Sequence, residues 1–169
     1  RAVTEIAGVH SRDRVLQFAS MSFDTAAEEI FPCLTTGATL VLRTQMMIDS
    51  VSGFLDRCRD WQLTLLDLPT AYWHEVVTRV KLEQLAFPES VKTVISGGER
   101  VLPQIVQRWA KLVGRTVRLL NTYGPTETTV AVTWSDLTGL GLQDELYEDV
   151  PIGRVIAQTS VYVLDRHRR

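Results

Sequence analysis

Polar and titratable side chains are concentrated in one short stretch of the sequence, Asn121 to Val130. The stretch reads Asn-Thr-Tyr-Gly-Pro-Thr-Glu-Thr-Thr-Val and combines an amide, a phenol, several hydroxyls and the carboxylate of Glu127. Gly124-Pro125 predicts a turn, because proline fixes φ while glycine permits almost any value. Polar loops at the end of a rigid strand are where α/β enzymes place their chemistry. By itself the stretch is equally compatible with an ordinary Gly-Pro turn before a Thr-rich strand.

Polar residues also accompany three other apolar runs of the chain. Phe23-Asp24 follows one run, Ser96-Gly97-Gly98-Glu99 follows a second, and Asp67 lies inside a third, where a buried carboxylate needs a partner. If the runs are parallel strands, their carboxyl ends share one edge of the sheet, so these residues should converge. Taken singly, Asp24 can be a helix cap and Gly97-Gly98 a tight turn, and the glycines lack the GxGxxG spacing of a dinucleotide site.

The elements that must position these residues alternate between strand and helix. Helices are expected at the start of the chain and from about residues 25, 50, 70 and 103, the helix at 25 with an apolar face of Ala26, Ala27, Ile30, Phe31 and Leu34. The pattern predicts an α/β fold with a largely parallel sheet flanked by helices. The predicted strands are residues 15–19, 39–42, 63–68, 91–95, 117–120, 128–134 and 160–164.

Composition limits the classes of protein that fit. The chain has 169 residues, 45% hydrophobic and 22% charged, which suits one globular domain. A net charge of −2 gives no sign of a nucleic-acid surface, and no apolar run approaches the length needed to span a membrane. Cys33 and Cys58 lack metal-ligand spacing and are expected to be reduced core thiols in a cytoplasmic protein.

Domain boundaries follow from a change of pattern near the end of the chain. Residues 1–134 are expected to form the alternating core, residues 135–150 an acidic Gly-containing loop, and residues 151–169 the start of a β-rich segment. The sequence starts at Arg1 without an initiating Met and ends at Arg169 just after a strand-like run. We therefore expect a fragment of a longer protein.

Four segments of the chain together resemble the adenylate-forming (AMP-binding) enzymes, in particular the amino-acid adenylation domains of nonribosomal peptide synthetases. Residues 121–128 resemble the core motif of that family, and residues 22–41 resemble the segment around its amino-acid pocket. Residues 96–99 resemble its adenine loop, and residues 151–165 the segment after its acidic loop. The resemblance implies part of the large N-terminal domain of such an enzyme, truncated at both ends.

This family activates a carboxylic acid with MgATP as an acyl-adenylate and then passes the acyl group to a phosphopantetheine thiol. The resemblance therefore implies ATP and Mg²⁺ as cofactors and phosphopantetheine supplied by a carrier domain. It implies an amino-acid substrate, with a peptidyl carrier domain and a condensation domain as partners, and neither nucleic acid nor membrane. The phosphate loop and catalytic Lys of the family are absent from residues 1–169, so we expect the fragment alone to be inactive.

The resemblance also assigns residues to the nucleotide. Thr126 is expected to contact the α-phosphate and Glu127 to ligate Mg²⁺, which makes these two the catalytic residues. Tyr123 is expected to stack on adenine, and Asn121 to hydrogen-bond its amino group. The predicted nucleotide-binding set is Gly97, Gly98, Glu99, Asn121, Tyr123, Gly124 and Thr126.

The amino-acid pocket is assigned in the same way. Asp24 matches the position that binds the α-ammonium of the substrate, and Phe23 is expected to wall the pocket. Glu28 and Asp67 would repel each other in a dry cavity unless a cation joins them, which predicts a cationic side chain such as lysine, β-lysine or ornithine. Alternatively, Glu28 faces solvent from its helix. The other predicted pocket residues are Thr25, Ile95, Gly97, Thr122, Val130 and Ala131.

Two other functions remain open from the sequence. One is a stand-alone acyl- or aryl-CoA ligase of the same superfamily, against which Asp24 and the continuation Thr126-Glu127-Thr128-Thr129 both weigh. The other is a non-catalytic α/β module that binds a nucleotide or a partner protein.

Overall fold

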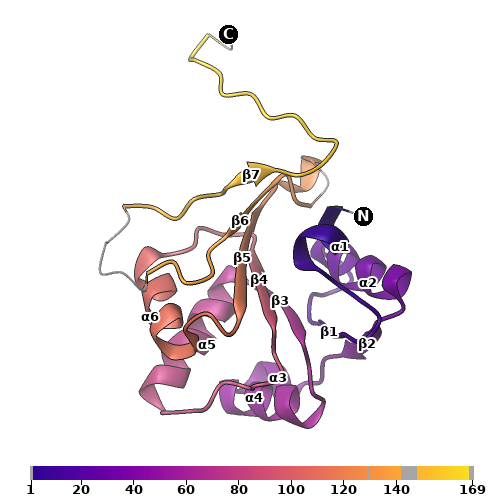
Figure 1. Cartoon of the computed structure of the whole chain (residues 1–169), viewed down its shortest axis with the longest axis vertical. Helices are drawn as coiled ribbons and strands as arrows, with labels where there is room; N and C mark the ends of the chain where they lie inside the picture. Colours follow the sequence, from indigo (N-terminus) through magenta and orange to yellow (C-terminus); the bar gives the residue numbers. More distant parts are fainter. Residues whose placement is uncertain (1, 129, 142–147, 168–169) are drawn as a thin grey trace.

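The computed structural model describes residues 2–128, 130–141 and 148–167, which form a mostly parallel seven-stranded sheet with helices on both faces (Figure 1). The sheet order is β2-β1-β3-β4-β5-β6-β7. Strands β1 to β5 pair in parallel, whereas β6 and β7 are antiparallel. This confirms the predicted α/β fold. The strands are β1 (Arg14–Gln17), β2 (Thr39–Leu42), β3 (Leu65–Pro69), β4 (Thr93–Gly97), β5 (Arg118–Tyr123), β6 (Thr133–Asp136) and β7 (Arg154–Val155).

Helices α1 and α2 lie on one side of the sheet, and α4, α5 and α6 lie on the other (Figure 1). Local sequence explains where several of them begin and end. Ser50 caps α4 by accepting a hydrogen bond from the Gly53 N–H at 3.1 Å, and Pro103 occupies the first turn of α6. The helices are α1 (Ala2–Ala7), α2 (Thr25–Thr36), α3 (Met46–Asp49), α4 (Val51–Asp60), α5 (Thr70–Leu82) and α6 (Pro103–Val113), with a 3₁₀ turn, η1, at Thr126–Thr128.

Strand β3 separates two hydrophobic cores, because alternate side chains point to opposite faces of a sheet. Leu66 and Leu68 belong to the larger core beneath α4, α5 and α6. Leu65 belongs to the smaller core, which it shares with Cys33 of α2. Asp67 is two residues after Leu65 and therefore lies on the α2 side of the sheet, within an otherwise apolar strand.

Helix α2 does not bury the face that the sequence predicted. Phe31 and Leu34 are 63% and 61% exposed, so this prediction is wrong for both residues. The helix instead buries Ala26, Glu29 and Cys33, which are three and four residues apart, together with Pro32. Glu29 was left out of the predicted face because it is charged, but the fold supplies it with hydrogen-bond donors.

The end of the chain also differs from the prediction. Residues 160–164 were expected to form a strand but have no regular structure, and they extend away from the body of the molecule (Figure 1). Tyr162 and Val163 are 78% and 97% exposed, because no described strand lies beside them to pair with. Strand β6 begins at Thr133 rather than at Thr128, because Thr128 is the last residue of η1 and residues 130–132 are not in a strand. Part of the predicted acidic loop, residues 142–147, lies outside the described residues.

Most of the other predicted elements appear close to their predicted places. They are the helix at the start of the chain, the four strands from β1 to β4, and the helices from about residues 25, 50, 70 and 103. The sequence analysis missed the short helix α3. None of the helices in the described part of the chain has the length and apolar character of a bilayer-spanning segment.

Candidate functional site

The sheet brings four of the predicted pocket residues to one face near the carboxyl ends of its central strands. The register of β3 and β4 places Asp67 opposite Ile95. The register of β4 and β5 places Gly97 opposite Thr122. Alternation along the strands puts all four on the side that α2 covers. This is the edge at which open α/β sheets bind ligands.

Two glycines near this edge are required by their neighbours. A Cβ on Gly97 would lie 2.5 Å from Oγ1 of Thr122, so a larger residue cannot fit beside that hydroxyl. A Cβ on Gly124 would overlap the carbonyl oxygen of Val130. The chain thus folds back tightly after β5, which places Val130 and the buried Ala131 against the Gly124 turn.

Carboxylates from the start of α2 and from β3 form an acidic cluster of Asp24, Glu28, Glu29 and Asp67. Burial raises the pKa of Glu28 to about 7, and the charges of Asp24 and Glu29 add to the effect. Burial also raises the pKa of Asp67 well above its usual value, followed by the charges of Glu28 and Glu29. The four groups therefore lie close enough to interact. Glu28 is half-buried and interacts with the cluster, which disfavours the alternative that it simply faces solvent.

Asp67 is the member of the cluster with the least satisfied side chain. It is only 4% exposed, and its Oδ2 atom has no hydrogen-bond partner among the described residues. Asp24 occupies the cap position of α2, yet its side chain makes no capping hydrogen bond. Thr25 is the first residue of the helix. Both aspartates thus keep carboxylate oxygens free for a ligand.

Glu29 is a buried member of this cluster that sequence reasoning missed. Its Oε1 atom accepts hydrogen bonds from the backbone N–H groups of Phe18 and Ala19, both at 2.9 Å. Its Oε2 atom accepts one from Nε2 of Gln17 at 3.0 Å. The spacing of Glu29 with Ala26 and Cys33 was the sequence signal that could have identified it.

The predicted nucleotide residues lie at the rim of the same edge. Asn121 is buried in β5 and donates from Nδ2 to the carbonyl oxygen of Pro151 at 3.0 Å, which leaves its Oδ1 free to accept. Tyr123 at the end of β5 is 50% exposed. Gly98 has a φ of 88°, which favours glycine. The remaining rim residues, Glu99, Thr126 and Glu127, are exposed, whereas Gly97 is half-buried.

The side chains near Glu127 could hold magnesium only if a bound ligand supplied further oxygen donors. In the described residues, no three His, Cys, Asp or Glu side chains are grouped so as to hold a metal. Mg²⁺ is usually bound through one or two carboxylates together with substrate phosphates and water. The exposed carboxylate of Glu127 on η1 therefore fits a site that nucleotide phosphates complete.

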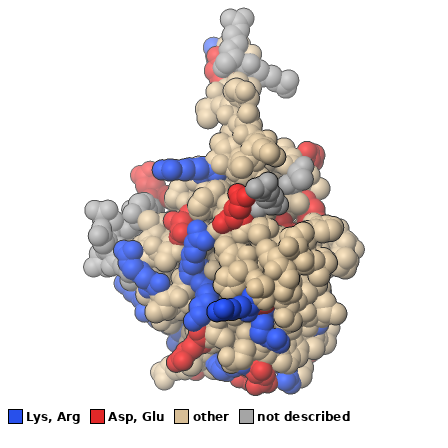
Figure 2. Space-filling model, turned by 45° about the vertical axis from the view of Figure 1, so that its right-hand side comes forward, with Lys and Arg blue, Asp and Glu red and all other residues tan. Residues whose placement is uncertain are grey.

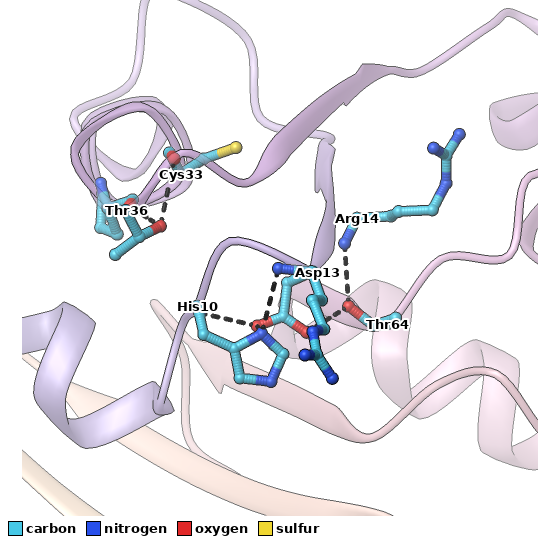
Figure 3. Close-up of polar contacts among 8 residues, drawn as sticks. His10, Asp13, Arg14, Cys33, Thr36 and Thr64 are labelled. Atoms are coloured by element: carbon cyan, nitrogen blue, oxygen red, sulfur yellow. Dashed lines mark hydrogen bonds and ion pairs between the residues drawn. The ribbon is translucent and has the colours of Figure 1, made fainter.

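A cavity of about 250 Å³ lies at the opposite edge of the sheet, and none of the predicted site residues lines it. Its Asp13 accepts a hydrogen bond from Oγ1 of Thr64 at 2.7 Å and one from the His10 N–H at 2.9 Å (Figure 3). Thr64 in turn accepts from the Arg14 N–H at 3.0 Å. These bonds tie the loop before β1 to the start of β3, so they serve the fold.

Polar loops and an acidic cluster at the carboxyl edge of a parallel sheet are typical of a ligand-binding α/β domain. The model for AMP-binding enzymes matches residues 1–169. The chain therefore belongs to the AMP-binding enzyme family.

Two relatives are similar to this chain in sequence along most of its length, and a solved structure shares its fold. The chain is 52% identical over 158 residues to an isonitrile lipopeptide synthase of Streptomyces coeruleorubidus, covering 94% of this chain and 10% of that protein. It is 32% identical over 159 residues to gramicidin S synthase 1 of Brevibacillus brevis, covering 94% of this chain and 13% of that protein. The fold matches the N-terminal subdomain of NpsA from Klebsiella oxytoca with a TM-score of 0.77 at 21% identity, covering 99% of this chain and 42% of that one. The chain thus spans only a small part of these curated relatives.

Proposed function

We propose that this chain is part of an amino-acid adenylation domain of a nonribosomal peptide synthetase. The complete domain is an ATP-dependent ligase that makes aminoacyl-AMP for transfer to the phosphopantetheine thiol of a peptidyl carrier domain. Membership of the AMP-binding family supports the reaction class. The observation that carries the choice of an amino acid is Asp24, whose carboxylate is not used as a helix cap and belongs to the acidic cluster. A fixed carboxylate is the natural acceptor for an α-ammonium group.

The residues at the rim would bind and orient ATP. The half-exposed ring of Tyr123 would stack on adenine, and Oδ1 of Asn121 would accept from the adenine amino group. The hydroxyl of Thr126 would donate to the α-phosphate, and Glu127 would hold Mg²⁺. The metal would neutralise phosphate charge when bound. The carboxylate oxygen of the amino acid then attacks the α-phosphorus, and the bond from that phosphorus to pyrophosphate breaks.

The acidic cluster supports a substrate with a cationic side chain. A carboxylate as buried as Asp67 is costly unless a proton or a cation accompanies it. Glu28 adds a second half-buried carboxylate beside it. An ammonium group from lysine, β-lysine or ornithine would satisfy both, while Asp24 binds the α-ammonium.

ATP–pyrophosphate exchange by the complete domain tests the reaction class. We expect exchange that depends on an amino acid and that Asp24→Asn reduces about 100-fold, because that variant removes the charge that orients the substrate. Asp60→Asn, at an exposed surface position on α4, is the matched control and should leave exchange unchanged. Exchange with fatty or aryl acids and none with amino acids would instead favour an acyl-CoA ligase of the same family.

A further inference from the structure

Glu29 links two elements that are distant in sequence. It is 1% exposed, and every contact of its two oxygens is with an N–H donor: Phe18 and Ala19 from the backbone, and Gln17 from its side chain. Strand β1 ends at Gln17, so the Phe18 and Ala19 N–H groups point out of the loop that follows the strand. The carboxylate supplies their acceptor and so attaches helix α2 to the end of β1.

The point of attachment lies within the acidic cluster. Glu28 is the neighbouring residue in the chain, and Asp24 lies five residues earlier, at the start of the same helix. Strand β1 pairs with β3, on which Asp67 lies. A shift or rotation of the first turn of α2 would therefore move Asp24 and Glu28 relative to Asp67.

Burying an ionised carboxylate costs free energy, so packing alone does not explain a glutamate at this position. An apolar residue at this position would satisfy helix packing but would leave the Phe18 and Ala19 N–H groups without the acceptor they have here. Burial raises the pKa of Glu29, and the hydrogen bonds from Ala19, Phe18 and Gln17, followed by the charge of Arg43, act against that rise. The Arg43 guanidinium also lies over the ring of Phe18, 5.3 Å from the centroid.

We propose that Glu29 is a positioning residue of the amino-acid site: by fixing the first turn of α2 on the end of β1, it sets Asp24 and Glu28 against Asp67. The identity of the ligand in this proposal rests on the proposed function. The attachment of α2 to the end of β1 by Glu29 does not depend on that function.

The first test is catalytic and uses the complete domain. Glu29→Gln keeps the shape of the side chain but presents an NH₂ group to N–H donors, so at least one hydrogen bond is lost. We expect KM for the amino acid to rise about 10- to 100-fold, because small misplacement of orienting groups is that costly. KM for ATP should change less than about twofold, since the rim residues are on other elements. Glu29→Asp retains the charge and should recover part of the loss.

Glu75→Gln, an exposed Glu on α5, is the matched control and should leave both KM values unchanged. An unchanged KM for the amino acid in Glu29→Gln would overturn the proposal. So would an equal rise of both KM values, which is what general loosening of the fold would cause.

The second test separates this proposal from the proposed function, because it needs no substrate. In hydrogen–deuterium exchange on the complete domain, Glu29→Gln should speed exchange in residues 18–29 and leave β3, β4 and β5 protected. If Glu29→Gln does not fold, Glu29→Asp should show the same local pattern to a smaller degree. Unchanged exchange in residues 18–29, or uniform loss of protection, would contradict the positioning role. If the wild-type domain shows no ATP–pyrophosphate exchange that depends on an amino acid, that result would contradict only the proposed function.

Discussion

Glu28 is the member of the acidic cluster whose pKa lies near neutral pH. Its pKa is raised from 4.5 to about 7 by burial first, and then by Asp24 and Glu29. Between these two values the folded chain binds a proton that the unfolded chain has released, so the free energy of unfolding falls as pH rises through this window. Asp67, whose pKa is also raised, contributes in the same direction.

Glu28→Gln should remove this loss of stability. Relative to the variant, the wild-type chain should lose about 2 kcal/mol of unfolding free energy between about pH 5 and pH 7, since each pH unit inside this window contributes at most about 1.4 kcal/mol. Urea denaturation of both chains across this range measures the difference. Curves that run parallel at all pH values would show that Glu28 does not titrate abnormally.

The same ionisation should control binding of a cationic substrate. Protonated Glu28 and Asp67 cannot pair with an ammonium group, so KM for lysine or ornithine should fall as pH rises from about 6 to 8. KM for ATP, measured in the same exchange reactions, should not follow this trend. In Glu28→Gln the pH dependence of the amino-acid KM should weaken, and a dependence equal to that of the wild type would exclude Glu28 as its source.

The roles of individual residues were only partly accessible from the sequence. Asp67 was identifiable because a carboxylate inside an apolar run needs a partner, and the structure leaves one of its oxygens unpaired. Asp24 and Glu28 came from the family resemblance, and the structure places both in the acidic cluster. Glu29 was missed because its donors, the Phe18 and Ala19 N–H groups, approach it only in the folded chain.

At the scale of elements, the close packing of β4 on β5 makes a specific prediction. Gly97→Ala should destabilise the chain by about 1–3 kcal/mol, because the new methyl group meets Oγ1 of Thr122 at 2.5 Å. Thr122→Ala removes that atom and should recover part of the loss in the double variant. A double-mutant cycle by chemical denaturation measures the coupling, and strictly additive losses would contradict the contact.

Helices and strands were predictable where a clear hydrophobic pattern in the sequence was matched by a neighbouring strand or helix in the fold. The apolar runs at residues 63–68 and 91–95 became β3 and β4, because each lies between neighbouring strands and beneath helices. The run at residues 160–164 has equally strong β propensity but lacks a pairing strand among the described residues. Phe31 and Leu34 have core-like spacing, yet α2 turns its other side, with Glu29, towards the sheet.

At the scale of the molecule, the α2 side, which Figure 2 turns forward, has a broad area without charged residues. Phe31, Leu34 and Leu42 are each more than 60% exposed. Strand β2 is also an open edge of the sheet. Surfaces of this kind promote association.

The isolated chain should therefore self-associate as its concentration rises. Sedimentation velocity should show species larger than 19.0 kDa, and Phe31→Ser with Leu34→Ser should shift the distribution towards the monomer. Leu82→Ser, at a position 72% exposed on α5, is the matched control and should have little effect. A monomer at all concentrations would contradict this prediction.

The central claim is that an AMP-binding domain with this acidic cluster activates an amino acid whose side chain is cationic. Lysine and norleucine differ by the ammonium group at the end of chains of similar length, so comparing them in ATP–pyrophosphate exchange by the complete domain isolates that group. We expect kcat/KM to be at least about 100-fold higher for lysine or ornithine than for norleucine, and Asp67→Asn to narrow the difference. Equal or better activation of norleucine by the wild-type domain would contradict the claim.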